Sequence, residues 1–344
     1  MKYFLEDATK HRARVHQLYF IGAFLRTKVN NRVFVKLDCR YKYYSTEYAK
    51  YFGRSLRLLK SMYGMTNSGK LFTDELKEWL FEAGFIQSQC QMSIYYKYAP
   101  DESKIVVLSY VDDCVYWYTD KNLGKWFVDT FGKIFHVNFL GYAHWFMSIR
   151  ISKMKDHYIS VDQDRYATSI AAKYFDTATV KVSKKFYKTT LPADMIFTKQ
   201  YVSTSDEQVE KLTREFKVHY IACIGSLIYL LSTRVDLSFA VHKLAKVSAN
   251  TDKVHFEGLV HLLIYIRDNN TLGLKYYAYM NDAPVTDLLR QAIIKTYNHL
   301  MYFSDSSWKD CPDTGRSTGA YSIFINVEKS TMAYMSHEQL LNNL

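Results

Sequence analysis

The fold is decided by residues 105–118, which read IVVLSYVDDCVYWY. Two apolar runs rich in β-branched and aromatic residues flank the adjacent acids Asp112 and Asp113. The two acids cannot lie side by side inside buried strands, because each would lose its hydration beside a like charge. At about 4 Å and an effective dielectric near 20, that repulsion is about 4 kcal/mol. The pattern therefore predicts a β-hairpin with both acids at its tip, where they are solvated or hold a cation.

A pair of carboxylates at a hairpin tip suits a hard divalent cation. Mg²⁺ binds carboxylate oxygens and keeps several waters. Two such ions about 3.5–4 Å apart can hold the attacking and leaving oxygens of a phosphoryl transfer. The simpler interpretation is a solvated turn, and the residue types alone favour it, because short motifs often match by chance.

The longer pattern around the acids changes this balance. Residues 109–115, SYVDDCV, resemble the Tyr-X-Asp-Asp signature of reverse transcriptases, and their surroundings resemble copia-type retrotransposon polyproteins. Four more blocks stand in that family's order, one before this pattern and three after it: LKSMYGM at 59–65, FLG with FMSIR in 139–150, IGSLIYL with TRVDLSFAV in 224–241, and YFSDSSW with GRSTGAY in 302–321. An unrelated α+β binding protein with an acidic hairpin is a weak alternative to five ordered blocks.

The resemblance implies both a fold and an activity. The implied fold is α+β: a palm-type antiparallel sheet with packed helices, then a helical connection and an incomplete ribonuclease H-like strand block. The implied activity is RNA-directed DNA synthesis, with Asp112 and Asp113 as catalytic residues that bind Mg²⁺ or Mn²⁺. Tyr110, Tyr63 and Gly64 are the implied contacts to nucleotide or nucleic acid. The implied partners are an RNA template and an RNA–DNA duplex, with other segments of the polyprotein as further candidates.

Tyr19 departs from the family pattern. Residues 17–25, QLYFIGAFL, align with the segment that carries a third metal-binding aspartate, and Tyr19 takes its place. A phenol has a reference pKa near 10 and one neutral oxygen, so it cannot replace a carboxylate that bridges Mg²⁺ ions. The nearest acids, Asp7 and Asp38, lie outside this apolar stretch. We therefore expect a degraded copy without polymerase activity, with Tyr19 beside the hairpin tip on a neighbouring strand.

Two hypotheses about activity remain from this comparison. One is a working RNA-directed DNA polymerase. The other is a non-catalytic remnant that keeps the fold and a basic surface for nucleic acid.

The family order also predicts how the chain is divided. The expected parts are a reverse transcriptase-like region with partial fingers at 1–184, a linker at 185–208, a helical connection at 209–299 and a truncated ribonuclease H-like segment at 300–344. Within the first part, apolar spacing by three and four predicts helices at 68–84 and 121–137, with Thr73 as a cap of the former. Strands are expected at 33–35, 144–151 and 157–161. The inward-facing residues are expected to be Leu71, Phe72, Leu76, Trp79 and Leu80 in the first helix, and Leu123, Trp126, Phe127 and Phe131 in the second.

The last segment carries part of a second metal site. Asp305 lies where the family places the first metal-binding aspartate of ribonuclease H, and strands are expected around it, at 321–325 and at 331–334. Glu338 falls near the third strand and is not a convincing second ligand. The resemblance thus implies a piece of a longer element, from mid-polymerase to early ribonuclease H, with an incomplete site at Asp305.

Composition fits these expectations. Lysine and arginine number 45 against 34 acids, and a net charge of +11 suits a polyanionic partner. The five scattered cysteines form no C-x-x-C pair, which argues against a disulfide framework or a structural zinc site and for a reducing compartment. The longest apolar stretch, 221–231, is far below the roughly 18 residues of a membrane span. We expect an intracellular, cytoplasmic or nuclear chain without a membrane partner.

Overall fold

The computed structural model describes residues 1–29, 32–36, 38, 40, 47, 50–51, 53–153, 158–174, 187–192, 195, 198, 205–277, 300–306, 318–325 and 335–340. The chain forms two compact units. The first comprises Met1 with Ala13–Ala143, and the second comprises Lys2–Arg12 with His144–Leu344. The predicted reverse transcriptase-like region at 1–184 is defined by sequence blocks and not by these compact units, so that division stays a prediction.

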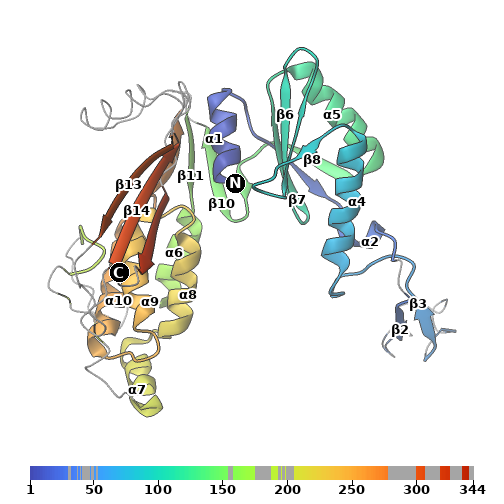
Figure 1. The fold of residues 1–344 in the computed structure, drawn as a ribbon. Helices are drawn as coiled ribbons and strands as arrows, with labels where there is room; N and C mark the ends of the chain where they lie inside the picture. Colours follow the sequence, from blue (N-terminus) through green and yellow to red (C-terminus); the bar gives the residue numbers. More distant parts are fainter. Residues whose placement is uncertain are drawn as a thin grey trace. The chain divides into compact units, whose positions relative to one another are not determined.

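A six-stranded antiparallel sheet forms the centre of the first unit (Figure 1). Its strand order is β4-β5-β6-β7-β1-β8. The strands are β1 (His16–Phe20), β4 (Ile86–Gln87), β5 (Ile94–Tyr98), β6 (Lys104–Tyr110), β7 (Asp113–Tyr118) and β8 (Val137–Tyr142). A separate strand pair, β2 (Phe34–Lys36) and β3 (Ser55–Arg57), follows the short helix α2 (Ala23–Arg26). The predicted strand at 33–35 corresponds to β2.

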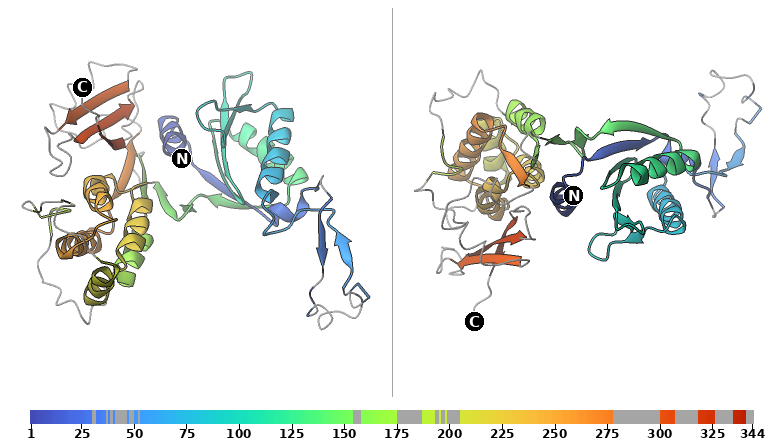
Figure 2. Two further views of the ribbon diagram at one scale, coloured as in Figure 1. Left: turned by 60° about the horizontal axis from the view of Figure 1, so that its bottom comes forward. Right: turned by 90° about the horizontal axis from the view of Figure 1, so that it is seen from above.

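Two helices cover one face of this sheet, α4 (Ser68–Glu82) and α5 (Lys121–Ile134), as Figures 1 and 2 show. Both were predicted from apolar spacing. They bury side chains at intervals of four residues against the sheet: Phe72, Leu76 and Leu80 from α4, and Leu123, Phe127 and Phe131 from α5. Each fully buried side chain of this size contributes about 1.5–3 kcal/mol. This layer supports the strands that carry the acidic pair.

Local hydrogen bonds set the ends of the two helices. The Asp120 side chain accepts hydrogen bonds from the backbone N–H groups of Asn122 and Leu123 and so caps α5. The predicted cap of α4 at Thr73 is wrong, because Thr73 lies inside the helix and its hydroxyl donates to the Gly69 carbonyl. Gly84 ends α4 with φ of +83°, a left-handed conformation that favours glycine.

A four-stranded antiparallel sheet with the order β12-β11-β10-β9 belongs to the second unit. Its strands are β9 (Trp145–Phe146), β10 (Ile149–Lys153), β11 (Tyr158–Asp162) and β12 (Gly273–Tyr277). The strand predicted at 144–151 is split, because Met147 and Ser148 both have positive φ and make a two-residue hairpin turn. The segment predicted as a helical connection, 209–299, is not wholly helical, since it contains β12. Gly273 is needed there, because a Cβ atom would lie 2.2 Å from the Val161 carbonyl oxygen.

Six α-helices are described in the second unit: α1 (Lys2–Lys10), α6 (Asp164–Tyr174), α7 (Asp206–Phe216), α8 (Tyr220–Leu230), α9 (Ser238–Lys246) and α10 (Lys253–Asp268). Helices α6, α8, α9 and α10 pack around one apolar core (Figure 2). The sequence did not predict α1 or α6, and α7 begins inside the predicted linker. Among the described residues, none of the helices is long and apolar enough to cross a membrane.

The last described strands form a three-stranded antiparallel sheet, β13 (Leu300–Ser306), β14 (Thr318–Ile325) and β15 (Met335–Leu340). Asp305 lies on β13, opposite Ala320 of β14. The third strand was predicted at 331–334, which lies outside the described residues, whereas β15 begins at Met335 and contains Glu338.

Candidate functional site

The acidic pair lies at the tip of the β6–β7 hairpin, as predicted. Tyr110 pairs with Asp113, so Val111 and Asp112 form a two-residue turn. Val111 has φ of +53°, although a β-branched side chain disfavours the left-handed region. Strained backbone of this kind is often kept where it positions a functional group.

Strand β1 brings Tyr19 beside this tip. The register pairs Tyr19 with Asp113, and the Phe20 backbone N–H donates to the Asp112 carbonyl oxygen at 2.9 Å. The predicted placement of Tyr19 on a neighbouring strand is therefore confirmed. Because side chains alternate along a strand, Tyr19 lies on the face opposite to Leu18 and Phe20, which pack into the helix-covered core.

The two carboxylates are held in an environment that disfavours their charged forms. Burial and the neighbouring charge of Asp113 raise the pKa of Asp112. Burial also raises the pKa of Asp113, while a hydrogen bond with the Gln17 side chain opposes that shift. One oxygen of Asp112, Oδ1, is buried and has no hydrogen-bond partner among the described residues. Such an oxygen is costly to bury unless a proton or a cation satisfies it.

Tyr63 approaches the same tip from the loop before α4. Slight desolvation of its hydroxyl, the charge of Asp112 and the hydroxyl of Tyr19 all raise the pKa of Tyr63, which indicates that the three groups are near one another. The Tyr63 ring meets Phe24 edge to face, with centroids 5.2 Å apart. The next residue, Gly64, has φ of +90°, a conformation that only glycine adopts readily.

Three tyrosines therefore surround the acidic pair. Tyr19, Tyr63 and Tyr110 expose 38%, 50% and 52% of their surface, so each ring can be reached by a ligand. Exposed aromatic rings beside a charged site are typical stacking surfaces for nucleobases.

The carboxylate oxygens at the hairpin tip are enough to bind one divalent cation but not two. Asp112 and Asp113 supply carboxylate oxygens, including the unpartnered Oδ1, and water can complete the shell of a single Mg²⁺. The described residues contain no cluster of three or more acidic, histidine or cysteine side chains that could hold a metal. Asp38, the nearest acid after Tyr19 in the chain, is paired instead with Arg40, whose Nε lies 2.8 Å from its Oδ1.

The sequence did not identify Gln17 as a site residue. Gln17 lies two positions before Tyr19 on β1, so strand alternation places it on the same face as the substituted position. This alternation of side chains along the strand was the sequence signal that could have identified Gln17. Asp305 belongs to the second unit, where the register pairs it with Ala320 of β14, which is paired in turn with Glu338 of β15.

The chain was compared with known proteins. Residues 1–190 match the family described as reverse transcriptase (RNA-dependent DNA polymerase). The chain is 25% identical over 271 residues to the retrovirus-related Pol polyprotein from transposon RE2 of Arabidopsis thaliana, which covers 75% of this chain and 17% of that protein. It is 24% identical over 213 residues to the Pol polyprotein from transposon TNT 1-94 of Nicotiana tabacum, which covers 61% of this chain and 15% of that protein.

A third, shorter relative is matched over most of its own length. The uncharacterized mitochondrial protein AtMg00810 of Arabidopsis thaliana is 26% identical over 222 residues, which is 64% of this chain and 78% of that protein. By contrast, the match spans about a sixth of the length of the two transposon polyproteins.

Proposed function

Because this chain belongs to the reverse transcriptase (RNA-dependent DNA polymerase) family and matches the reverse transcriptase region of copia-type retrotransposon polyproteins, we propose that its first unit is a polymerase palm that binds nucleic acid but does not extend a primer. One observation carries the proposal: the register pairs Tyr19 with Asp113. The position that faces the acidic pair thus holds a phenol, where the family resemblance implies a carboxylate.

The loss of synthesis follows from the number of carboxylates. In-line phosphoryl transfer by the two-ion arrangement requires carboxylates that bridge the ions. Asp112 and Asp113 are enough for one Mg²⁺ or Mn²⁺ ion, which supplies positive charge that can attract a phosphate group. Tyr19 supplies one neutral oxygen, and it cannot anchor a second ion.

Nucleic-acid binding does not depend on the missing carboxylate. The chain carries a net charge of +11, which favours a polyanion at long range. The exposed rings of Tyr19, Tyr63 and Tyr110 offer stacking surfaces next to the acidic pair. An RNA template and an RNA–DNA duplex are the proposed partners.

A primer-extension assay tests the proposal. The full chain is incubated with an RNA template, a DNA primer, the four deoxynucleoside triphosphates and either Mg²⁺ or Mn²⁺. We expect no extension above the background of the Asp112→Asn variant. Asp129→Asn is the matched control, because Asp129 is an exposed aspartate on α5 with no role in the site.

Templated extension that Asp112→Asn abolishes and Asp129→Asn leaves intact would overturn the claim that synthesis is lost. A chain that neither extends a primer nor binds an RNA–DNA duplex would contradict the binding half of the proposal instead.

A further inference from the structure

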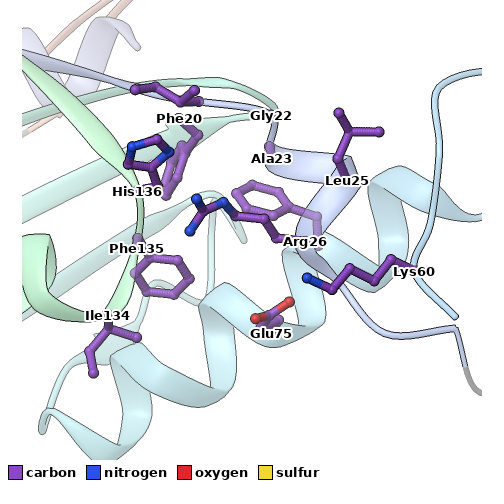
Figure 3. A pocket seen from close by; sticks show the side chains of 12 residues that line it. Phe20, Gly22, Ala23, Leu25, Arg26, Lys60, Glu75, Ile134, Phe135 and His136 are labelled. Atoms are coloured by element: carbon purple, nitrogen blue, oxygen red, sulfur yellow. The ribbon is translucent and has the colours of Figure 1, made fainter. Parts of the chain in front are cut away.

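A cavity of about 630 Å³ opens where β1 ends, between α2, α4 and the end of α5 (Figure 3). Its volume lies within the range of about 300–1,000 Å³ that is typical of small-molecule sites. Phe20, which lines the cavity, is on the helix-covered face of β1, whereas Tyr19 is on the face of the acidic pair. The cavity is therefore distinct from the carboxylate site.

The inner wall of the cavity is aromatic. Phe20, Phe72 and Phe135 line it and are 2%, 4% and 8% exposed, so only a small part of each ring faces the cavity. The Phe20 ring lies 4.9 Å from Phe72 and 5.7 Å from Phe135, in edge-to-face contacts that hold all three in place. The side chains of Leu25 and Ile134 line the same cavity and add most of its exposed apolar surface. Ring edges and aliphatic side chains together make a wall against which a flat apolar group can pack.

The rim of the cavity carries charged side chains that do not form ion pairs with one another. Figure 3 shows Arg26, Lys60 and Glu75 around the opening; they come from α2, the loop between β3 and α4, and α4. Over the described part of the chain, these three side chains make neither an ion pair nor a side-chain hydrogen bond. Two cations against one carboxylate attract an anionic group, and the carboxylate can accept a hydrogen bond from an N–H or O–H donor.

We propose that this cavity binds a nucleoside monophosphate. The base lies against the aromatic wall, the phosphate pairs with Arg26 and Lys60, and an amino or hydroxyl group of the nucleoside donates to Glu75. A free inorganic phosphate would leave the aromatic wall unused. An uncharged nucleoside would leave both cations without a partner.

Isothermal titration of the full chain with AMP, adenosine and inorganic phosphate tests this inference. The buffer contains EDTA, so that no metal ion can bridge a phosphate to Asp112 and Asp113. We expect AMP to bind at least about tenfold more tightly than either adenosine or phosphate, because the ring and the charge both contribute.

Substitutions locate the binding. Arg26→Ala and Lys60→Ala should each weaken AMP binding about tenfold, which is the loss expected for one charge-assisted hydrogen bond. The matched control is Lys70→Ala, which removes an exposed lysine of α4 outside the cavity and should leave the affinity unchanged. Glu75→Gln should weaken binding of AMP more than Glu78→Gln, an exposed glutamate of the same helix.

Three outcomes would overturn the inference. AMP and phosphate of equal affinity would show a simple anion site. An equal loss in Lys70→Ala would show unspecific attraction by the basic surface. A loss of AMP binding in Asp112→Asn would place the nucleotide at the acidic pair. None of these results depends on primer extension or duplex binding, so the proposed function is tested separately.

Discussion

Tyr19 determines how many carboxylates face a cation at the hairpin tip. It pairs with Asp113, so an aspartate at position 19 would place a third carboxylate beside Asp112 and Asp113. Without metal, that third charge adds repulsion to a pair whose pKa values are already raised by burial. With metal, it completes a set of oxygen ligands.

We therefore predict opposite effects of Tyr19→Asp in the two conditions. In EDTA, the melting temperature should be lower than that of the natural chain. Saturating Mn²⁺ should raise it more in the variant than in the natural chain, since a ligand present at 100 times its Kd stabilises by about 2.7 kcal/mol. Thermal denaturation with and without Mn²⁺ measures this, and Tyr19→Asn is the uncharged control. If Mn²⁺ raised the melting temperature of the natural chain and of both variants equally, position 19 would not face the cation.

Val111 stores backbone strain at the same tip. A β-branched residue with φ of +53° costs about 1–2 kcal/mol relative to its preferred conformations. Glycine adopts this conformation freely but loses about 0.5–1 kcal/mol through unfolded-state entropy. We predict that Val111→Gly is neutral or raises the free energy of unfolding by up to about 1 kcal/mol. Val254→Gly, at a similarly exposed valine in α10, should lower it.

Among the elements, α5 depends on a close approach to β7. A Cβ atom at Gly124 would lie 2.5 Å from the Tyr118 ring, and that ring is stacked on His16 with centroids 5.0 Å apart. We predict that Gly124→Ala lowers the free energy of unfolding by about 1–3 kcal/mol, because the helix or the ring must move. Gly225→Ala in α8, where the added atom meets nothing within 4 Å, should raise it by up to about 1 kcal/mol. Urea titration of both variants checks the contrast.

Helix α1 carries a buried carboxyl group. Glu6 is 6% exposed, and burial, with a smaller effect of Asp7 against that of Lys10, raises its pKa to about 7. Tyr276 of β12 has a buried hydroxyl without a hydrogen-bond partner among the described residues, and burial together with Glu6 raises the pKa of that phenol. The protonated form of Glu6 is thus favoured in the folded state.

This predicts a loss of stability as the pH rises. The pKa of Glu6 in the folded chain lies above its unfolded value near 4.5. Its contribution to the free energy of unfolding is therefore complete below pH 4.5 and is lost as the pH rises through 7. The loss from this group is on the order of 3 kcal/mol. Glu6→Gln should flatten that part of the stability curve and be more stable than the natural chain at pH 8, while the exposed Glu78→Gln should not. A variant curve parallel to that of the natural chain would contradict the assignment.

At the level of the whole molecule, net charge governs association with nucleic acid. With +11 overall, the chain should bind an RNA–DNA duplex without sequence preference. The logarithm of the affinity should fall linearly with the logarithm of salt concentration, with a slope of about −0.9 for each phosphate contacted on a B-form duplex. Fluorescence anisotropy with two duplexes of scrambled sequence measures both effects. An affinity that is insensitive to salt would point to a protein partner instead.

The sequence by itself determined the features that depend on neighbouring residues. Two apolar runs around Asp112 and Asp113 predicted the hairpin, and spacing by three and four predicted α4 and α5. The ordered blocks predicted the family, and residues 1–190 match it. These signals are local, because strand alternation, helical periodicity and like-charge repulsion each act over a few residues.

Only the tertiary structure decided which distant residues meet. The register of β1 brings Gln17 and Tyr19 to the hairpin, and packing of α4 against the sheet brings Arg26, Lys60 and Glu75 around one cavity. It also assigned β12 to a strand within a segment predicted to be helical, because its backbone pairs with β11. The physical reason is that such contacts depend on which surfaces the folded core leaves adjacent, and the spacing of residues along the chain does not record this.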